Sequence, residues 1–225
     1  MNQGEWERLI DDLKSGGDPG LRAREILAAL TDRSRIRDLE RLIRDADDFV
    51  REAAASGLIN LEGLRALPLL LEALRRGSEE GHDNDTLAFE VTELVEMEKA
   101  EAAPLLLDLL RSDRPELRAQ AAWLLGYLDD TVDPGPLIEA VNDPSPDVRA
   151  EAAGALSSFP WRPGVLEAML SLLDDPDEGV RVSSASALGY LGERRAVPAL
   201  LGALNDPSAE VRRFARHSLK LLGAD

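Results

Sequence analysis

The feature that most constrains the fold of this chain is a step of one apolar residue followed by arginine, which recurs along the sequence. The last four steps start at residues 117, 148, 180 and 211, so they lie 31, 32 and 31 residues apart. Regular self-similarity of this length is typical of repeat proteins. One repeat cannot bury its apolar face alone, so neighbouring repeats must stack to form a core. The earlier steps are Leu21-Arg22 and Val50-Arg51.

One repeat departs from this spacing. Val50 and Leu117 are 67 residues apart, which leaves room for two repeats. The missing step falls at Thr86-Leu87, because Leu94 then occupies the place that Leu58 and Leu125 hold in the flanking repeats. Five extra residues precede it, in the segment "GSEEGHDNDT". We therefore predict an irregular repeat over residues 77–112, opened by a longer loop after a helix that ends near Arg76.

Each repeat reads as two helices. The first carries small and apolar residues at helical spacing, as in "VRAEAAGALSSF", and the second is rich in leucine, as in "AVPALLGALND". Asp-Pro pairs at 143–144, 175–176 and 206–207 end one helix and start the next. We predict six helix pairs, a preceding helix near 4–14 and a closing helix near 210–222, all in one domain over residues 1–225. The fold class is all-α.

The segments "DPSPDVRAEAAGAL" and "DPSAEVRRFARHSLKLLG" resemble HEAT repeats of the short bacterial type, which are called phycobilisome-lyase-like. The likeness runs from about residue 20 to the end. It implies a right-handed α-solenoid with terminal capping helices, and it says little about function because one solenoid serves many tasks.

The resemblance also gives a role to charges that recur in the repeats. An aspartate lies six residues before the arginine in four repeats: Asp45/Arg51, Asp143/Arg149, Asp175/Arg181 and Asp206/Arg212. In the family such pairs form a ladder between neighbouring repeats, so we interpret these charges as structural. In the irregular repeat both positions are lost, because Gly81 and Leu87 occupy them, and before Arg118 the position is Ser112.

The irregular repeat is the first candidate binding surface. From residue 79 to 101 it holds nine acids and one lysine, in a chain whose net charge is −17. Three interpretations are open: a solvated acidic face, a docking site for a basic protein, or a metal site at His82, Asp83 and Asp85. The segment "HDND" lacks the glycine and distal glutamate of a calcium loop. The candidate partner-binding residues are Glu79, Glu80, Asp83, Asp85, Glu90, Glu93 and Glu96.

A second candidate surface follows from the resemblance, since second helices line the concave side of HEAT solenoids. The matching positions place Arg44, Arg75 and Arg111 in one column, with Glu72 and Asp108 three residues before the last two. These arginines could contact acidic groups of a partner. Alternatively, Glu72–Arg75 and Asp108–Arg111 are exposed ion pairs of small energetic weight.

Catalytic chemistry has little support in the sequence. There is no cysteine, the two histidines are His82 and His217, and no His-Glu dipeptide or phosphate-binding glycine loop occurs. We expect no enzyme activity, no cofactor and no metal. A bilin lyase or its accessory subunit is the alternative, because those proteins share this repeat.

Trp161, in the turn "FPWRPG", is either a packing residue or a binding anchor.

The composition limits the choice of partner. With 43 acids against 26 bases the chain lacks the clustered cations that nucleic-acid binding needs. No long apolar run or signal peptide is visible, so we expect a cytoplasmic protein that binds no membrane and is a monomer on its own.

The predicted function is a protein-interaction module, which acts as a scaffold, an adaptor or an inhibitor and recognises a basic protein. A toxin-neutralising immunity protein is one concrete version.

Overall fold

A computed structural model describes residues 1–81, 84–128 and 132–224, and within these ranges every regular element is helical. The predicted all-α class and the arrangement of six helix pairs between a first and a closing helix are confirmed. The chain divides into two compact units, Met1–Glu98 and Lys99–Asp225, which are described separately. The division falls inside the irregular repeat, between its two helices.

Unit 1 begins with α1 (Gln3–Ser15), whose start is fixed by a capping box between Asn2 and Glu5. Three first helices, α2, α4 and α6, then follow, and α2 and α4 are each followed by a second helix. The elements are α2 (Gly17–Ala28), η1 (Arg33–Arg35), α3 (Ile36–Leu42), α4 (Asp48–Glu62), η2 (Gly63–Ala66), α5 (Leu67–Glu80) and α6 (Asp85–Met97).

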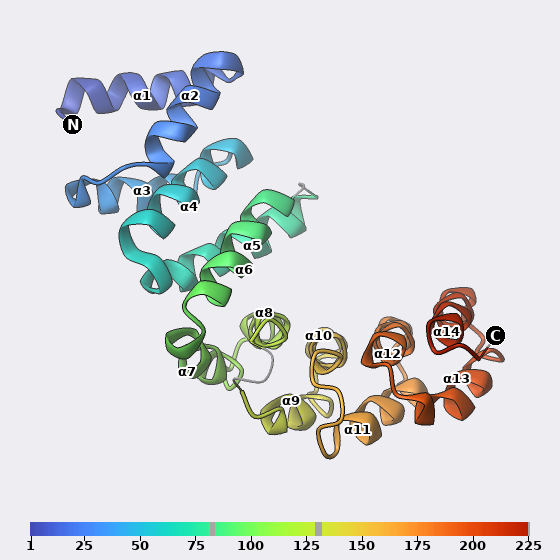
Figure 1. The fold of residues 1–225 in the computed structure, drawn as a ribbon. Helices are drawn as coiled ribbons and strands as arrows, with labels where there is room; N and C mark the ends of the chain where they lie inside the picture. Colours follow the sequence, from blue (N-terminus) through green and yellow to red (C-terminus); the bar gives the residue numbers. More distant parts are fainter. Residues whose placement is uncertain (82–83, 129–131, 225) are drawn as a thin grey trace. The chain divides into compact units, whose positions relative to one another are not determined.

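Unit 2 continues the same alternation. Figure 1 shows α8, α10, α12 and α14 side by side, with the shorter second helices along one edge of this row. The elements are α7 (Lys99–Leu109), α8 (Pro115–Leu125), α9 (Gly135–Ala140), α10 (Pro146–Leu156), α11 (Val165–Ser171), η4 (Leu172–Asp174), α12 (Glu178–Leu191), η5 (Arg194–Ala196), α13 (Val197–Ala203) and α14 (Ala209–Leu221).

Small residues let consecutive first helices approach closely. A Cβ atom on Gly189 of α12 would lie 2.5 Å from the Ser218 side chain and 2.8 Å from its Cα on α14. A Cβ on Gly126, just after α8, would lie 2.9 Å from the Cα of Ala155 on α10. These positions therefore require glycine because of space, whereas Gly154 on the exposed side of α10 has nothing within 4 Å.

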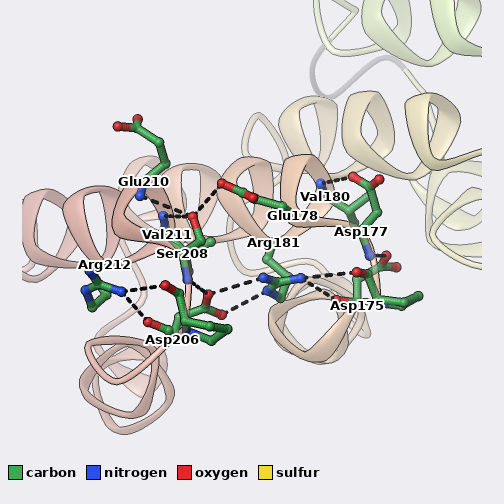
Figure 2. Close-up of polar contacts among 12 residues, drawn as sticks. Asp175, Asp177, Glu178, Val180, Arg181, Asp206, Ser208, Glu210, Val211 and Arg212 are labelled. Carbon is green, nitrogen blue, oxygen red and sulfur yellow. Dashed lines mark hydrogen bonds and ion pairs between the residues drawn. The ribbon is translucent and has the colours of Figure 1, made fainter.

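The predicted ladder is present in unit 2. Arg181 donates from Nε and Nη2 to the carboxylate of Asp206, at 2.9 and 3.2 Å, so it bridges to the next repeat. Its Nη1 donates to the main-chain oxygen of Asp175 in its own turn, at 3.0 Å (Figure 2). Arg118 and Arg149 make the same two-oxygen contact, to Asp143 and Asp175.

The ladder explains why Ser112 is tolerated. Arg118 Nη1 donates to the main-chain oxygen of Ser112, at 2.9 Å, so this half of the contact needs no particular side chain. The carboxylate is needed by the arginine of the preceding repeat. In the preceding repeat this arginine is replaced by the buried Leu87. No arginine there needs a carboxylate at position 112, so serine is sufficient.

In unit 1 the ladder is completed by a substitution that the sequence analysis missed. Buried Arg51 pairs with Glu80, at 2.8 Å, in place of the aspartate that Gly81 replaces. Glu80 can reach Arg51 because α5 continues to Glu80 and ends at Gly81 in the left-handed region. The expected loop over 77–85 and the helix end near Arg76 were therefore wrong for residues 77–80, which form an extra helical turn.

The first apolar–arginine step also differs from the expectation. Leu21 and Arg22 are exposed on α2, and the buried positions there are Gly20, Ala23 and Leu27. The buried positions of α2 therefore lie one residue away from those that the alignment on Leu21-Arg22 predicts. In consequence Arg22 makes no ladder contact with Asp45, which is paired instead with Lys14 of α1, at 3.0 Å.

By length and composition alone, the run Asp48–Glu80 is apolar enough to cross a membrane, but 61% of its most apolar window is buried. It is interrupted at Gly63, where α4 ends with a positive φ of 56°. Its apolar side chains form much of the core of unit 1, as core helices of a folded protein do.

Glycine substitutions test the close helix approach. We expect Gly189→Ala to lower the free energy of unfolding by about 1–3 kcal/mol, because the new methyl group overlaps Ser218. Gly154→Ala should raise it by about 0.5–1 kcal/mol, since alanine is the better helix former and nothing obstructs it. Urea denaturation of both variants measures this. Equal effects of the two substitutions would show that the helices are not held at this distance.

Arginine substitutions test the ladder. Arg181→Ala leaves the Asp206 carboxylate, which is 9% exposed, without its partner and should cost about 1–3 kcal/mol. The control is Arg194→Ala in η5, an exposed residue whose side chain has no partner among the described residues, and it should change stability by no more than about 0.5 kcal/mol. Denaturant midpoints compare the two. Coinciding midpoints would mean that the recurring pair does not hold the repeats together.

Candidate functional site

Two of the predicted acidic residues are used inside unit 1. Glu79 accepts from Arg75 Nη1 at 2.5 Å, one turn earlier on α5. Glu80 pairs with Arg76 at 2.7 Å as well as with Arg51. Both carboxylates therefore stabilise the last turn of α5 and the ladder, which makes Glu80 a structural residue.

Glu90 was expected on an exposed face, and this is wrong. It is half-buried, and the Ser56 hydroxyl of α4 donates to its carboxylate at 2.8 Å. An Arg24 nitrogen of α2 lies 3.8 Å away. Burial raises the pKa of Glu90, against the opposing effects of Ser56 and Arg24. The residue joins three stacked helices.

The remaining acids of α6 form an exposed surface together with two large apolar residues. Glu93 and Glu96 are exposed and make no hydrogen bond or ion pair with the described part of the chain. Phe89 and Met97 are 61% and 84% exposed, and the spacing of 89, 93, 96 and 97 places all four on one helix face. We call these four residues the α6 stripe.

The sequence analysis missed Phe89 and Met97. The signal that could have found them is their helical phase, because they lie opposite the buried Leu87, Val91 and Val95. Asp85 is exposed in the first turn of α6 and has contacts of its own. Asp83 and His82 lie outside the described residues, so the metal alternative at this place stays a hypothesis; elsewhere in the described chain no three potential ligands cluster.

The predicted arginine column is divided between the two units. In unit 1 Arg75 is held between Glu72, at 2.6 Å, and Glu79, and these two carboxylates raise the pKa of its guanidinium. Arg44 is exposed and donates to the main-chain oxygen of Glu40, at 2.5 Å. Arg75 is therefore neutralised, and the interpretation of Glu72–Arg75 as an ion pair is confirmed.

In unit 2 the expected pair between Asp108 and Arg111 is not formed by their side chains; Arg111 only donates from its main chain to the Asp108 oxygen, at 3.1 Å. The exposed Arg111 instead lines a groove of about 200 Å³ between α7 and α9. The other residues that line this groove are Leu107, Leu110, Pro136, Glu139, Ala140, Asn142 and Asp143. Of the predicted concave arginines, Arg75 is held by two carboxylates, whereas Arg44 and Arg111 are exposed and make no ion pair within the described chain.

The comparisons place the chain in a family. The family described as HEAT repeats matches residues 81–157 and 134–220, and the PBS lyase HEAT-like repeat matches residues 50–76. These matches extend over more than half of the sequence, so the chain belongs to the HEAT-repeat proteins. No curated protein matches it significantly.

Solved structures agree on the fold. The complex of CpcE and CpcF of phycocyanin lyase from Nostoc sp. PCC7120 is 22% identical with a TM-score of 0.55, over 69% of this chain and 98% of that one. An engineered protein is 19% identical with a TM-score of 0.49, over 100% and 98% of the two chains. A designed armadillo repeat protein in complex with the peptide (KR)4 is 19% identical with a TM-score of 0.48, over 95% and 98%. At 22% identity, the likeness to the CpcE–CpcF complex shows the fold alone.

The pKa of Glu90 gives a pH-dependent prediction. The pKa of Glu90 is raised in the folded state, so at neutral pH its ionised carboxylate lowers the free energy of unfolding. This cost disappears as the pH falls and the carboxylate is protonated. Glu90→Gln keeps an acceptor for Ser56 and removes the charge. We expect the free energy of unfolding to rise at pH 7, by no more than about 1 kcal/mol, and the gain to shrink toward pH 3.

Urea denaturation at both pH values measures the difference from the unchanged protein, with the exposed Glu96→Gln as control. A loss of stability at pH 7 in Glu90→Gln would mean that attraction by Arg24 outweighs the burial of the carboxylate.

Proposed function

We propose that this HEAT-repeat chain is a non-catalytic protein-interaction module, and that the α6 stripe binds a protein with basic and apolar side chains. The observation that carries the proposal is the exposure of Phe89 and Met97 beside Glu93 and Glu96, two acids that make no hydrogen bond or ion pair with the described residues. HEAT repeats are protein-interaction modules, which supports this class of function.

The stripe has the composition of an interface. Aromatic residues and methionine are enriched at the centre of protein interfaces, where burial of their apolar area supplies most of the binding energy. Methionine adapts its shape to different contacts because its side chain is unbranched. The local conformation of α6 does not require Phe89 or Met97 at these positions, since neither side chain contributes to the buried face of the helix.

Charge complements this apolar contact. The formal charge of −17 and the free carboxylates of Glu93 and Glu96 would attract a basic protein over several ångströms and accelerate its association. A scaffold, an adaptor or an inhibitor would all use the stripe in this way. An immunity protein that blocks a basic toxin is a specific case of the inhibitor.

A bilin-lyase-type enzyme, or an accessory subunit of one, is the second candidate. It is supported by the match of residues 50–76 to the PBS lyase HEAT-like repeat and by the similarity to the CpcE–CpcF complex. Addition of a bilin to the purified chain distinguishes the two functions. A shifted bilin absorbance band would favour the lyase type, and an unchanged spectrum would favour the interaction module.

The stripe is tested by a triple variant, Phe89→Ala, Glu93→Gln and Glu96→Gln. A matched control on α2, Leu21→Ala, Asp18→Asn and Glu25→Gln, removes one exposed leucine and two exposed acids from the same unit. Both are used as baits in lysate with quantitative mass spectrometry, and the captured protein is then measured by surface plasmon resonance at two salt concentrations.

We expect the stripe variant to weaken binding at least about tenfold, as loss of one interface anchor does, and to flatten the salt dependence of association. The control should bind like the unchanged protein. If both triples weaken binding equally, only the overall charge matters. If neither does, the stripe is not the binding surface and the groove at Arg111 becomes the better candidate.

A further inference from the structure

The turn between α10 and α11 presents a tryptophan to solvent in an unfavourable backbone conformation. Trp161 has a φ of 64°, the single positive value at a non-glycine residue among those described, and its side chain is 73% exposed. L-residues avoid this region because of steric crowding at Cβ. Of the two interpretations that the sequence left open, packing is therefore wrong: the indole is not part of the core.

Two neighbours hold the turn in place. Phe159 is fully buried, and the main-chain N–H of Trp161 donates to Glu193 Oε1 at 3.2 Å. Glu193, which precedes η5, is only 3% exposed. A conformation that is strained and yet fixed from both sides is characteristic of functional positions. Glycine would adopt this φ without strain, so the tryptophan side chain itself calls for an explanation.

The turn borders a groove of about 490 Å³. Leu166 supplies an apolar contact, and four charged residues surround it: Arg162, Glu167, Glu193 and Arg195. Arg195 is 68% exposed and pairs with Glu167 at 2.7 Å, so these two charges cancel. Arg162 has no ion pair within the described chain and can donate to a ligand.

Glu193 is the group of the groove whose side chain has few hydrogen bonds for a buried carboxylate. Its side chain accepts one hydrogen bond, from Trp161, and the nearest cation is Arg195 Nη1 at 3.7 Å, beyond hydrogen-bond distance. A carboxylate can accept about four hydrogen bonds, and a buried carboxylate with few of them favours any further donor. The position of Arg195 between Glu167 and Glu193 shows that the groove accommodates a guanidinium.

We propose that this groove binds an arginine or lysine side chain on an extended segment of a protein partner. The cation stacks on the face of the Trp161 indole, the preferred aromatic ring for such contacts, and donates to Glu193. Arg162 donates to main-chain carbonyl oxygens of the same segment. An acidic side chain is disfavoured here, since it would lie against Glu193, whose carboxylate has no cation within hydrogen-bond distance. The site is on unit 2 and does not depend on the α6 stripe.

The test uses the full chain and blocked tripeptides, acetylated and amidated at their ends, with arginine, lysine, norleucine or glutamate in the centre. Nuclear magnetic resonance follows the three tryptophan indole N–H signals, and the signal lost in Trp161→Gly assigns Trp161. We expect the arginine and lysine peptides to shift this signal and to leave those of Trp6 and Trp123 in place. Equal shifts by the norleucine or the glutamate peptide would overturn the proposal.

Variants separate binding from folding. Glu193→Gln keeps the acceptor for the Trp161 N–H but removes the charge, and it should weaken the arginine peptide about tenfold, as loss of a charge-assisted hydrogen bond does. Asp174→Asn, with the same change in net charge, should leave affinity unchanged, and equal weakening by both would overturn the site. Trp161→Gly should abolish binding of the arginine peptide. Its melting temperature should stay level or rise, because glycine removes the strain at this φ. A marked fall in the melting temperature would show that Trp161 is structural.

Discussion

Unit 2 depends on one contact that recurs at each of its repeat junctions, the two-oxygen hydrogen bond between an arginine and the aspartate of the next repeat. Arg181 shows how it works: Nη1 holds the oxygen of Asp175 in its own turn, while Nε and Nη2 hold the carboxylate of Asp206 in the following turn. Asp206 in turn accepts from the main-chain N–H of Ser208 and so fixes the start of α14. One guanidinium thereby sets the distance between two turns, the conformation of both, and the stacking of the helices that leave them. The rigid planar geometry of arginine makes this possible, and lysine could not replace it.

The sequence predicted this part of the fold well, because its cause is local and periodic. The spacing of 31 or 32 residues, the Asp-Pro pairs and the small residues each favour the same helix pairs. Where a distant residue decides, the prediction failed. The letters of "GSEE" favour a loop, yet residues 77–80 are helical, and Glu80 at the end of this turn pairs with Arg76 one turn earlier and with Arg51, which is 29 positions away in the sequence. The exposed Leu21 failed for a similar reason, since the stacking of α2 on α4 selects Gly20 and Ala23 for burial instead.

The candidate surfaces were predicted less well than the fold, because net charge is visible in a sequence and burial is not. Glu90 and Glu93 are three residues apart on one helix, but the first lies against Ser56 and the second faces solvent. Four of the six described residues of the predicted acidic cluster, Glu79, Glu80, Asp85 and Glu90, thus make contacts of their own. The surface that remains is defined as much by Phe89 and Met97, which look like ordinary helix residues in the sequence. Trp161 could be singled out from its turn, but its positive φ and its bond to Glu193 depend on a residue 32 positions later.

The ladder also bears on where recognition can evolve in such a chain. Residues that join repeats are fixed, since a change in one arginine leaves a carboxylate of the next repeat without its partner. Freedom is greatest where the structure departs from the regular repeat: in α6, whose ladder arginine is replaced by Leu87, and in the turn at Trp161, where a residue other than glycine has a positive φ. Both places carry large exposed side chains that contribute nothing to the core. Exposure alone does not mark a binding site, since Leu21 and Tyr190 are also exposed in regular repeats. At α6 the exposed apolar residues lie beside two acids that make no ion pair within the described chain, and at Trp161 the exposed indole stands on a strained turn that is held by Glu193, so binding explains both places better than structure does.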